Sequence, residues 1–117
     1  MRRLNKDEIY IIDKLIDVSP VSIKLLSPLD TCFVSKENDG DMGSLKIIYP
    51  INNLLEVNLI SSQSQIDYLD KDGVLVNITL MIDKNEHILR EVDVFKTDFS
   101  SLIAPFDINN IVSIYQV

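Results

Sequence analysis

Two carboxylates and an aromatic ring alternate along the predicted strand 87–97. Glu91, Asp93 and Phe95 stand two residues apart, so in an extended chain their side chains leave the same face. The two valines between them occupy the opposite face, which we expect to meet the core. Paired carboxylates at this spacing perform general acid–base chemistry when they are buried. Here the alternation predicts that they face water, so we assign no catalytic residue and take these three residues as the candidate interaction surface.

A second group of acidic residues lies in a predicted turn. Glu37, Asp39 and Asp41 flank Gly40 in a segment whose composition is typical of a loop. Carboxylate and carbonyl oxygens are the ligands that Ca²⁺ prefers, but no bidentate glutamate follows at the spacing of an EF-hand. The loop is therefore a weak candidate acidic site, and we assign no metal. The run from Asp70 to Gly73, DKDG, is in the same way typical of a hairpin turn.

The sequence contains few residues of the types that nucleophilic catalysis or cofactor binding requires. The chain has one cysteine, Cys32, and one histidine, His87, which fall in different predicted strands. A Cys–His pair stays open on the sequence alone, but we expect Cys32 to be a buried, unreactive thiol. Zinc would need more histidine or cysteine ligands. No phosphate-binding or dinucleotide-binding glycine motif is present, so no cofactor is assigned.

The charge balance limits the classes of partner. The 117 residues carry a formal net charge of −7, with a pI near 4.5. This balance disfavours nucleic acid and anionic membrane surfaces, both of which require clustered Lys and Arg, and it suits a basic protein partner. No apolar run approaches the roughly 20 residues of a membrane span, and no signal peptide is evident, so we expect a cytoplasmic protein.

The clearest predicted element is a helix over residues 5–18. Asn5 is suited to the N-cap, and Glu8 three residues later completes a capping-box pattern. Apolar residues recur at helical spacing along one face, and Ser19-Pro20 ends the helix. A second, short helix is expected over 21–29.

Alternating apolar residues predict strands at 31–36, 45–49, 74–82 and 87–97. Residues 56–69 are expected to form one long strand, or two with a break, and the polar middle suggests a bulge or an exposed edge. The tail 107–117 fits a helix or a strand. The expected fold is a single α+β domain over 1–117, in which an N-terminal helix (or two) packs on an antiparallel β-meander of about five strands. Lys96 and Arg90 leave the core face of the last strand, and we expect them to reach solvent or to pair with acids of the helix.

Two segments resemble the signatures of a known family. The run 39–45, DGDMGSL, resembles DGGMGSL, and the run 91–102, EVDVFKTDFSSL, resembles ELDVWKVDFSPL. Together with the opening MRRL and the turn 70–73, these runs make the chain similar to a small family of bacterial proteins of unknown function. Among the departures from the signatures, Asp41, Phe95 and Ser101 replace Gly, Trp and Pro. The resemblance implies no activity, although small acidic proteins of this kind often resemble members of toxin–immunity neighbourhoods.

Three hypotheses about function follow. We expect a non-catalytic protein-interaction module, such as an immunity or regulatory protein that binds a basic partner. The alternative from another class is an enzyme that uses acidic residues, with or without a divalent metal. The third is a structural homo-oligomer whose exposed strand edges pair with a second copy.

Overall fold

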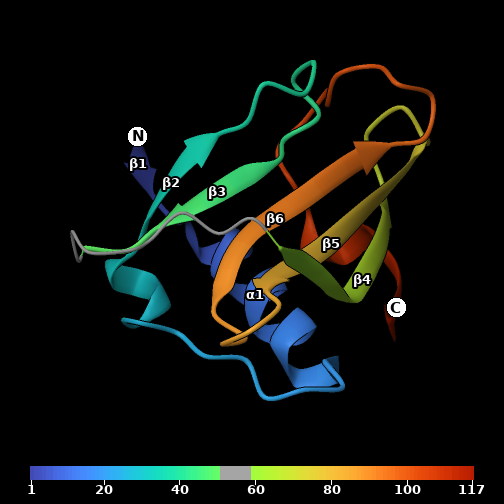
Figure 1. Ribbon diagram of the computed structural model, residues 1–117. Helices are drawn as coiled ribbons and strands as arrows, with labels where there is room; N and C mark the ends of the chain where they lie inside the picture. Colours follow the sequence, from blue (N-terminus) through green and yellow to red (C-terminus); the bar gives the residue numbers. More distant parts are fainter. Residues whose placement is uncertain (51–58) are drawn as a thin grey trace.

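The computed structural model describes residues 1–50 and 59–117, which form a seven-stranded antiparallel sheet with one α-helix on one face (Figure 1). The predicted connector 51–55 and residues 56–58 of the next predicted strand lie outside the described residues. The elements, in chain order, are β1 (Arg2–Arg3), α1 (Lys6–Val18), the 3-10 turn η1 (Leu29–Thr31), β2 (Phe33–Lys36), β3 (Leu45–Ile48), β4 (Ile60–Leu69), β5 (Leu75–Asp83), β6 (Leu89–Lys96), the 3-10 turn η2 (Ile108–Asn110) and β7 (Ile111–Gln116).

Helix α1 begins where its capping residues predict. The Asn5 side chain accepts from the Glu8 backbone N–H at 2.8 Å, and the Glu8 carboxylate accepts from the Asn5 N–H at 2.9 Å. This reciprocal capping box confirms the predicted start of the helix. The buried residues of α1 are Ile11, Ile12 and Leu15, and the Leu15 carbonyl accepts a hydrogen bond from the buried Ser64 hydroxyl of β4 at 2.7 Å. That bond fixes the C-terminal half of the helix over β4.

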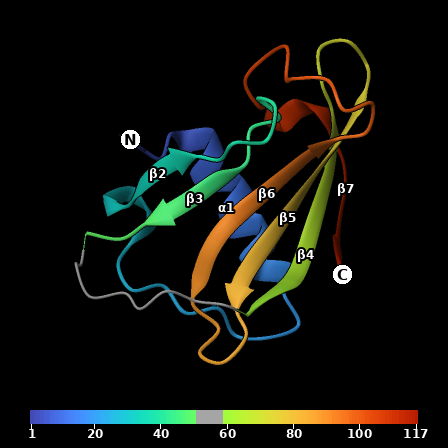
Figure 2. The same cartoon turned by 45° about the horizontal axis from the view of Figure 1, so that its top comes forward.

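The sheet is larger than the sequence predicts and differs in strand order. It has seven strands rather than about five, in the order β1-β2-β3-β6-β5-β4-β7. The strands β4, β5 and β6 form a meander, but β3 pairs with β6 through Leu45↔Val92. In the strand order, β6 and β5 therefore lie between β3 and β4, which follow each other in the chain. The predicted break in the polar middle of β4 is present as a register shift between Ser62 and Ser64. The C-terminal tail is strand β7, beside β4 (Figure 2).

The second predicted helix, over 21–29, is wrong. Residues 21–28 form no helical turn, Leu29 only begins the 3-10 turn η1, and Lys24 forms an isolated parallel bridge with Ile88. The Lys24 N–H donates to the His87 carbonyl at 2.9 Å, and the Leu89 N–H donates to the Lys24 carbonyl at 3.0 Å. Prolines at 20 and 28 bracket the segment and disfavour helical backbone at the residues before them. The backbone groups of Lys24 therefore bond to the start of β6 instead of to a helical turn.

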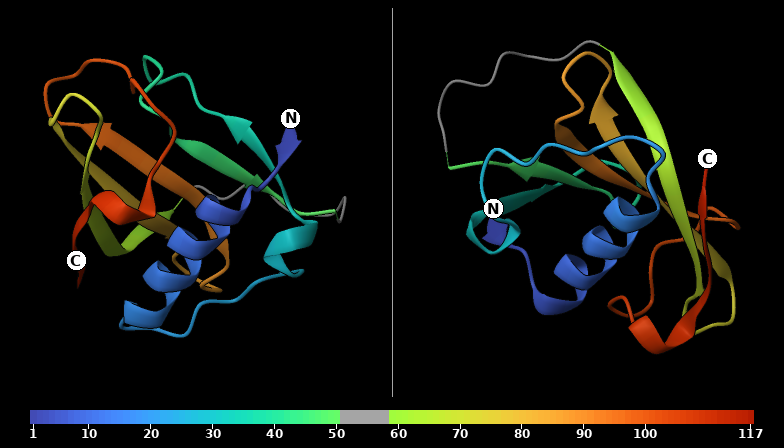
Figure 3. Two further views of the ribbon diagram at one scale, coloured as in Figure 1. Left: turned by 180° about the vertical axis from the view of Figure 1, so that it is seen from behind. Right: turned by 90° about the horizontal axis from the view of Figure 1, so that it is seen from below.

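The two faces of the sheet differ in what covers them. Helix α1 lies across one face, here called the inner face, and contacts β4, β5 and β7 (Figure 3). Ile66, Val76, Leu80 and Leu89 are fully buried in the sheet. The opposite, outer face has no helix over it in the described part of the chain. No described helix is both long enough and apolar enough to span a membrane.

Candidate functional site

The three candidate interaction residues lie together on the outer face of β6. Because Val92 and Val94 are buried on the inner side, Glu91, Asp93 and Phe95 emerge on the outer side. Glu91 is half-buried, Asp93 is exposed, and the Phe95 side chain is 39% exposed. The arrangement confirms the predicted alternation along this strand, and we refer to these three residues as the outer stripe.

Negative charge is crowded around Glu91. Partial burial raises the pKa of the Glu91 carboxyl, and the neighbouring charges of Glu37 and Asp93 raise it further. Lys46, which is directly opposite Glu91 in the β3–β6 register, acts in the other direction. The carboxylates therefore repel one another more than Lys46 compensates. A cation placed beside them would relieve this repulsion.

An exposed aromatic pair ends the outer stripe. The rings of Phe95 and Phe99 meet edge to face, with centroids 5.1 Å apart at 81°. Phe99 is 73% exposed and has a φ of +63°, in the left-handed region that phenylalanine rarely adopts. Two rings held together in water next to carboxylates form a surface with both apolar and acidic character.

The acidic loop does not gather its carboxylates into one site. Asp39 accepts hydrogen bonds from the backbone N–H groups of Met42 at 3.2 Å and Ser44 at 2.9 Å, and these bonds shape the loop. Asp41 forms an ion pair with Lys36, and Glu37 lies near Glu91. Among the described residues, no group of three or more His, Cys, Asp or Glu side chains is placed to hold a metal ion.

Cys32 and His87, the other candidate pair, have separate environments. Cys32 is fully buried, and its Sγ lies 3.4 Å from the Pro28 carbonyl oxygen and 3.6 Å from the Ser27 hydroxyl. His87 lies in the turn before β6, with a φ of +60°. The predicted burial of the thiol is confirmed.

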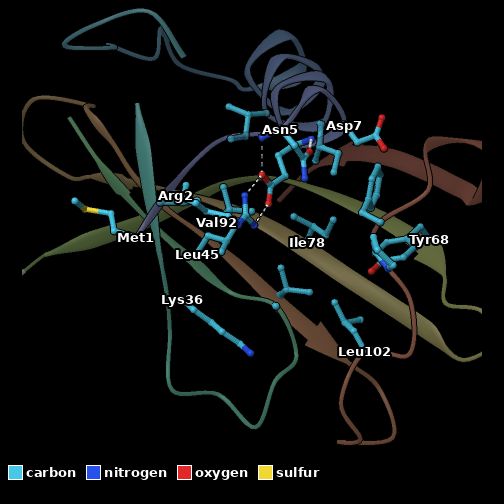
Figure 4. Close-up of a pocket in the computed structure, with 18 residues that line it drawn as sticks. Met1, Arg2, Asn5, Asp7, Lys36, Leu45, Tyr68, Ile78, Val92 and Leu102 are labelled. Carbon is cyan, nitrogen blue, oxygen red and sulfur yellow. Dashed lines mark hydrogen bonds and ion pairs between the residues drawn. The ribbon is translucent and has the colours of Figure 1, made fainter. Parts of the chain in front are cut away.

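A groove on the inner face is the main feature that the sequence did not predict. Helix α1 covers the β4–β5–β7 half of that face, and the groove lies between the start of α1, the β2–β3–β6 half and residues 102–106 (Figure 4). Its volume is about 580 Å³. The lining side chains come from α1, six strands and the segment after β6, so no local pattern identifies them as one set. The sequence predicts part of the floor only through the alternation that turns Val92 and Val94 inward.

Charged side chains at the mouth of the groove are paired with one another. The Arg2 guanidinium donates to both carboxylate oxygens of Glu8, each at 2.7 Å, and the same carboxylate caps α1. Lys36, across the groove, pairs with Asp41 of the acidic loop. Two ion pairs therefore lie at the mouth of the groove, above the apolar side chains that line its floor.

Comparison with known protein families gives a match over most of the chain. A family model described as a domain of unknown function, DUF6984, matches residues 1–105 of this chain. The chain belongs to the DUF6984 family. The resemblance that the two signature runs suggested, to a family of unknown function, is thereby confirmed. No curated protein and no solved structure matches the chain.

In this DUF6984 chain the two signature runs contact each other. The Leu102 N–H donates to the Asp41 carbonyl at 3.0 Å. The buried Ser44 hydroxyl donates to the Val94 carbonyl at 3.1 Å and accepts from the Val94 N–H at 2.8 Å. A Cβ on Gly43 would lie 2.7 Å from the Leu102 side chain. The signatures therefore describe a packed junction of the loop 39–44 with the end of β6.

The same DUF6984 chain buries a charged cluster behind that junction. Lys96 is fully buried, and its Nζ donates to Asp70 at 2.8 Å, to Asp72 at 2.7 Å and to the Ser101 carbonyl at 3.2 Å. The expectation that Lys96 reaches solvent or pairs with acids of the helix is wrong, because the acids of the β4–β5 turn lie closer. Arg90 pairs instead with Asp83, at 3.6 Å.

Proposed function

We propose that this DUF6984 chain is a non-catalytic interaction module whose outer stripe binds a basic protein surface. The observation that carries the proposal is the exposed Phe95–Phe99 pair beside crowded carboxylates, on a sheet face that no described helix covers. Aromatic rings are enriched in interfaces, where they supply buried area at low entropic cost. An immunity or regulatory protein that recognises a basic partner is the kind of molecule that such a surface serves.

Charge favours a basic partner over a neutral one. The net charge of −7 draws cationic surfaces towards the protein, and Lys or Arg side chains beside Glu91 would offset the repulsion from Glu37 and Asp93. The aliphatic stems of the same Lys or Arg side chains would cover the exposed rings, and an Arg guanidinium can stack on them.

A titration with a short Lys/Arg-rich peptide, followed by NMR, tests the surface itself. We expect amide shifts concentrated at Glu91, Asp93, Phe95 and Phe99, and binding that weakens as salt is added. Shifts spread evenly over the acidic side chains of α1 and the stripe would show non-specific attraction, and would overturn the proposal.

Affinity capture with matched variants tests the partner. The double variant Glu91→Gln/Asp93→Asn removes two charges from the stripe, and Asp13→Asn/Asp17→Asn removes the same charge from exposed positions on α1. A true partner is retained by the wild type and by the helix variant but lost by the stripe variant, with all three proteins unfolding at similar temperatures. Equal retention by both variants would exclude the stripe as the binding surface.

A second candidate function, self-association, has its own observation. Strand β7 is one edge of the sheet, and its sequence IVSIYQ contains no charge and no proline, the devices that usually protect edges. Val112 is 60% exposed and Val117 is 65% exposed. The other edge, β1, consists of two arginines. A copy of β7 could pair antiparallel with this neutral strand without bringing like charges together.

Light scattering measures this directly. Self-association predicts a mass of twice 13.3 kDa for the wild type. The variant Val112→Lys should have the mass of the monomer. Ile103→Lys adds the same charge at a side chain that is 58% exposed and lies outside the strand β7, so it should leave the dimer intact. A wild-type monomer at all concentrations would contradict the self-association role.

A further inference from the structure

The groove on the inner face is larger than packing defects in protein interiors. Voids in cores are few and rarely exceed the size of a water molecule, and an engineered empty cavity of about 150 Å³ is already large enough to bind benzene. The groove measures about 580 Å³, which lies within the roughly 300–1,000 Å³ typical of small-molecule sites. Its size therefore points to a bound molecule rather than to a fault in packing.

The floor of the groove is apolar. Val34, Val92, Val94 and Ile78 line it, and each is buried as part of the inner face of the sheet. Leu45, on β3, and Leu102, after β6, line it from partly buried positions (Figure 4). A molecule that removed this floor from water would have to present an apolar surface to it.

Both cationic side chains among the described residues that line the groove are already paired with carboxylates. Arg2 is bound by both oxygens of Glu8, and Lys36 is paired with Asp41. Asp7 is the remaining charged side chain of the lining, and it is exposed on the first turn of α1. A negative head group at the mouth would meet these carboxylates, and a charged group of either sign that entered the groove would have to leave water for an apolar floor.

We infer that the groove is a binding site for an uncharged, largely apolar small molecule. The site lies on the inner face, behind β6, whereas the outer stripe lies on the other face of the same strand. The inference goes beyond the proposed function and does not depend on it.

Three probes with the same hydrocarbon chain and different head groups test the charge preference: 1-octanol, octanoate and octylammonium. In an NMR titration of the full chain, we expect octanol to shift the amides of Leu45, Val92, Val94 and Leu102. The two ions should bind at least about tenfold more weakly. No binding of octanol at these residues up to its solubility limit, or equal or tighter binding of either ion, would overturn the inference.

A matched pair of substitutions tests the location. Leu45→Phe places extra carbon atoms in the groove, and Leu75→Phe makes the same change on β5, at a side chain that is 36% exposed. We expect Leu45→Phe to abolish octanol binding and Leu75→Phe to leave it unchanged. Val92→Leu, a smaller change in the floor, should weaken binding and serves where Leu45→Phe does not fold. Unchanged octanol affinity in the folded groove variants would show that the probe binds elsewhere.

Discussion

Lys96 is the most deeply buried charged residue in the part of the chain that the structure describes. Its amino group is enclosed by Asp70, Asp72 and the Ser101 carbonyl, and Asp70 also accepts from the Ile103 N–H at 2.9 Å. These bonds join the β4–β5 turn, the end of β6 and the segment that follows β6. Removing one partner from such a cluster leaves a buried charge without compensation.

Replacing Lys96 with Met should therefore lower the melting temperature by roughly 10 °C or more. The variant keeps the length and the apolar stem of the side chain but leaves Asp70 unpaired. Lys71→Met, which removes an exposed lysine from the same turn, is the control and should change the melting temperature little. Thermal unfolding measured by circular dichroism compares the two, and equal losses would show that the cluster contributes nothing.

The same cluster predicts a pH dependence. Burial works against ionisation of Asp70, but the hydrogen bonds from Lys96, Ile103 and Lys71 outweigh it and lower the pKa of Asp70 below its ordinary value of 3.8. Burial likewise disfavours the charged form of Lys96, but hydrogen bonds to Asp70 and Asp72 outweigh it and raise the pKa of Lys96. A carboxyl group whose pKa is lower in the folded state than in the unfolded state stabilises the fold at pH values above its unfolded pKa. This stabilisation is lost as the pH falls through the folded pKa. The difference in stability between wild type and Lys96→Met should therefore shrink below pH 3.8.

Gly43 and Gly40, both in the loop of the first signature run, allow the cost of backbone strain to be measured apart from the cost of a steric clash. Both have positive φ, +101° and +71°, but only at Gly43 would a Cβ meet another residue, at 2.7 Å from Leu102. Gly40→Ala should cost roughly 1–2 kcal/mol from backbone strain alone. Gly43→Ala should cost about 1–3 kcal/mol more, because Leu102 must move. Urea denaturation measures both, and a smaller cost at Gly43 than at Gly40 would show that the loop and Leu102 do not pack as described.

Residue-level prediction from the sequence succeeded where a contact depends on local spacing. The alternation of Glu91 and Asp93 with Val92 places those residues on the correct faces. The partners of Lys96 were missed because Asp70 lies 26 residues away, and only the register of β4, β5 and β6 brings the two together. The groove was missed for the same reason, since its lining depends on where α1 stops covering the sheet.

At the level of elements, α1 shows why a local signal predicts a boundary well. Its first turn contains both halves of the capping box, and Glu8 additionally binds Arg2 of β1. The ambiguous tail shows the opposite, because Ile111, Val112 and Ile114 suit a strand or a helix until pairing with β4 decides. The pairing of β3 with β6 has no local signal, because it joins residues 45 and 47 apart in the chain.

Substitutions of Glu8 should separate its capping role from its ion pair. Glu8→Ala removes both and should cost about 1–1.5 kcal/mol of stability. Glu8→Gln keeps a side chain that can accept from the Asn5 N–H and loses only the charge opposite Arg2, so it should cost at most about 0.5 kcal/mol. Chemical denaturation distinguishes them. Equal costs would mean that the ion pair, and not the cap, stabilises the start of α1.

At the scale of the whole molecule, excess negative charge should limit stability. A net charge of −7 on a chain whose radius of gyration is 13.5 Å makes the folded state repel itself more than the expanded unfolded state does. Added salt screens surface charges within about 10 Å at 0.1 M ionic strength, whereas the buried Lys96 cluster is screened much less. The melting temperature should therefore rise between low and moderate NaCl concentrations.

Crowding at the outer stripe should account for a measurable part of that salt effect. Because the raised pKa of Glu91 means that its ionised form is disfavoured in the folded state, stability is lost as the pH rises towards and through that pKa. Glu91→Gln should then stabilise the protein at pH 7 by about 0.5 kcal/mol and reduce its gain from salt, with no benefit at a pH where Glu91 is protonated. Asp13→Asn makes the same change of charge on the exposed face of α1, outside the crowded stripe. If Asp13→Asn changes the stability as much as Glu91→Gln at every pH, the carboxylates of the stripe do not repel one another measurably. A basic partner would then gain no binding energy by reducing that repulsion.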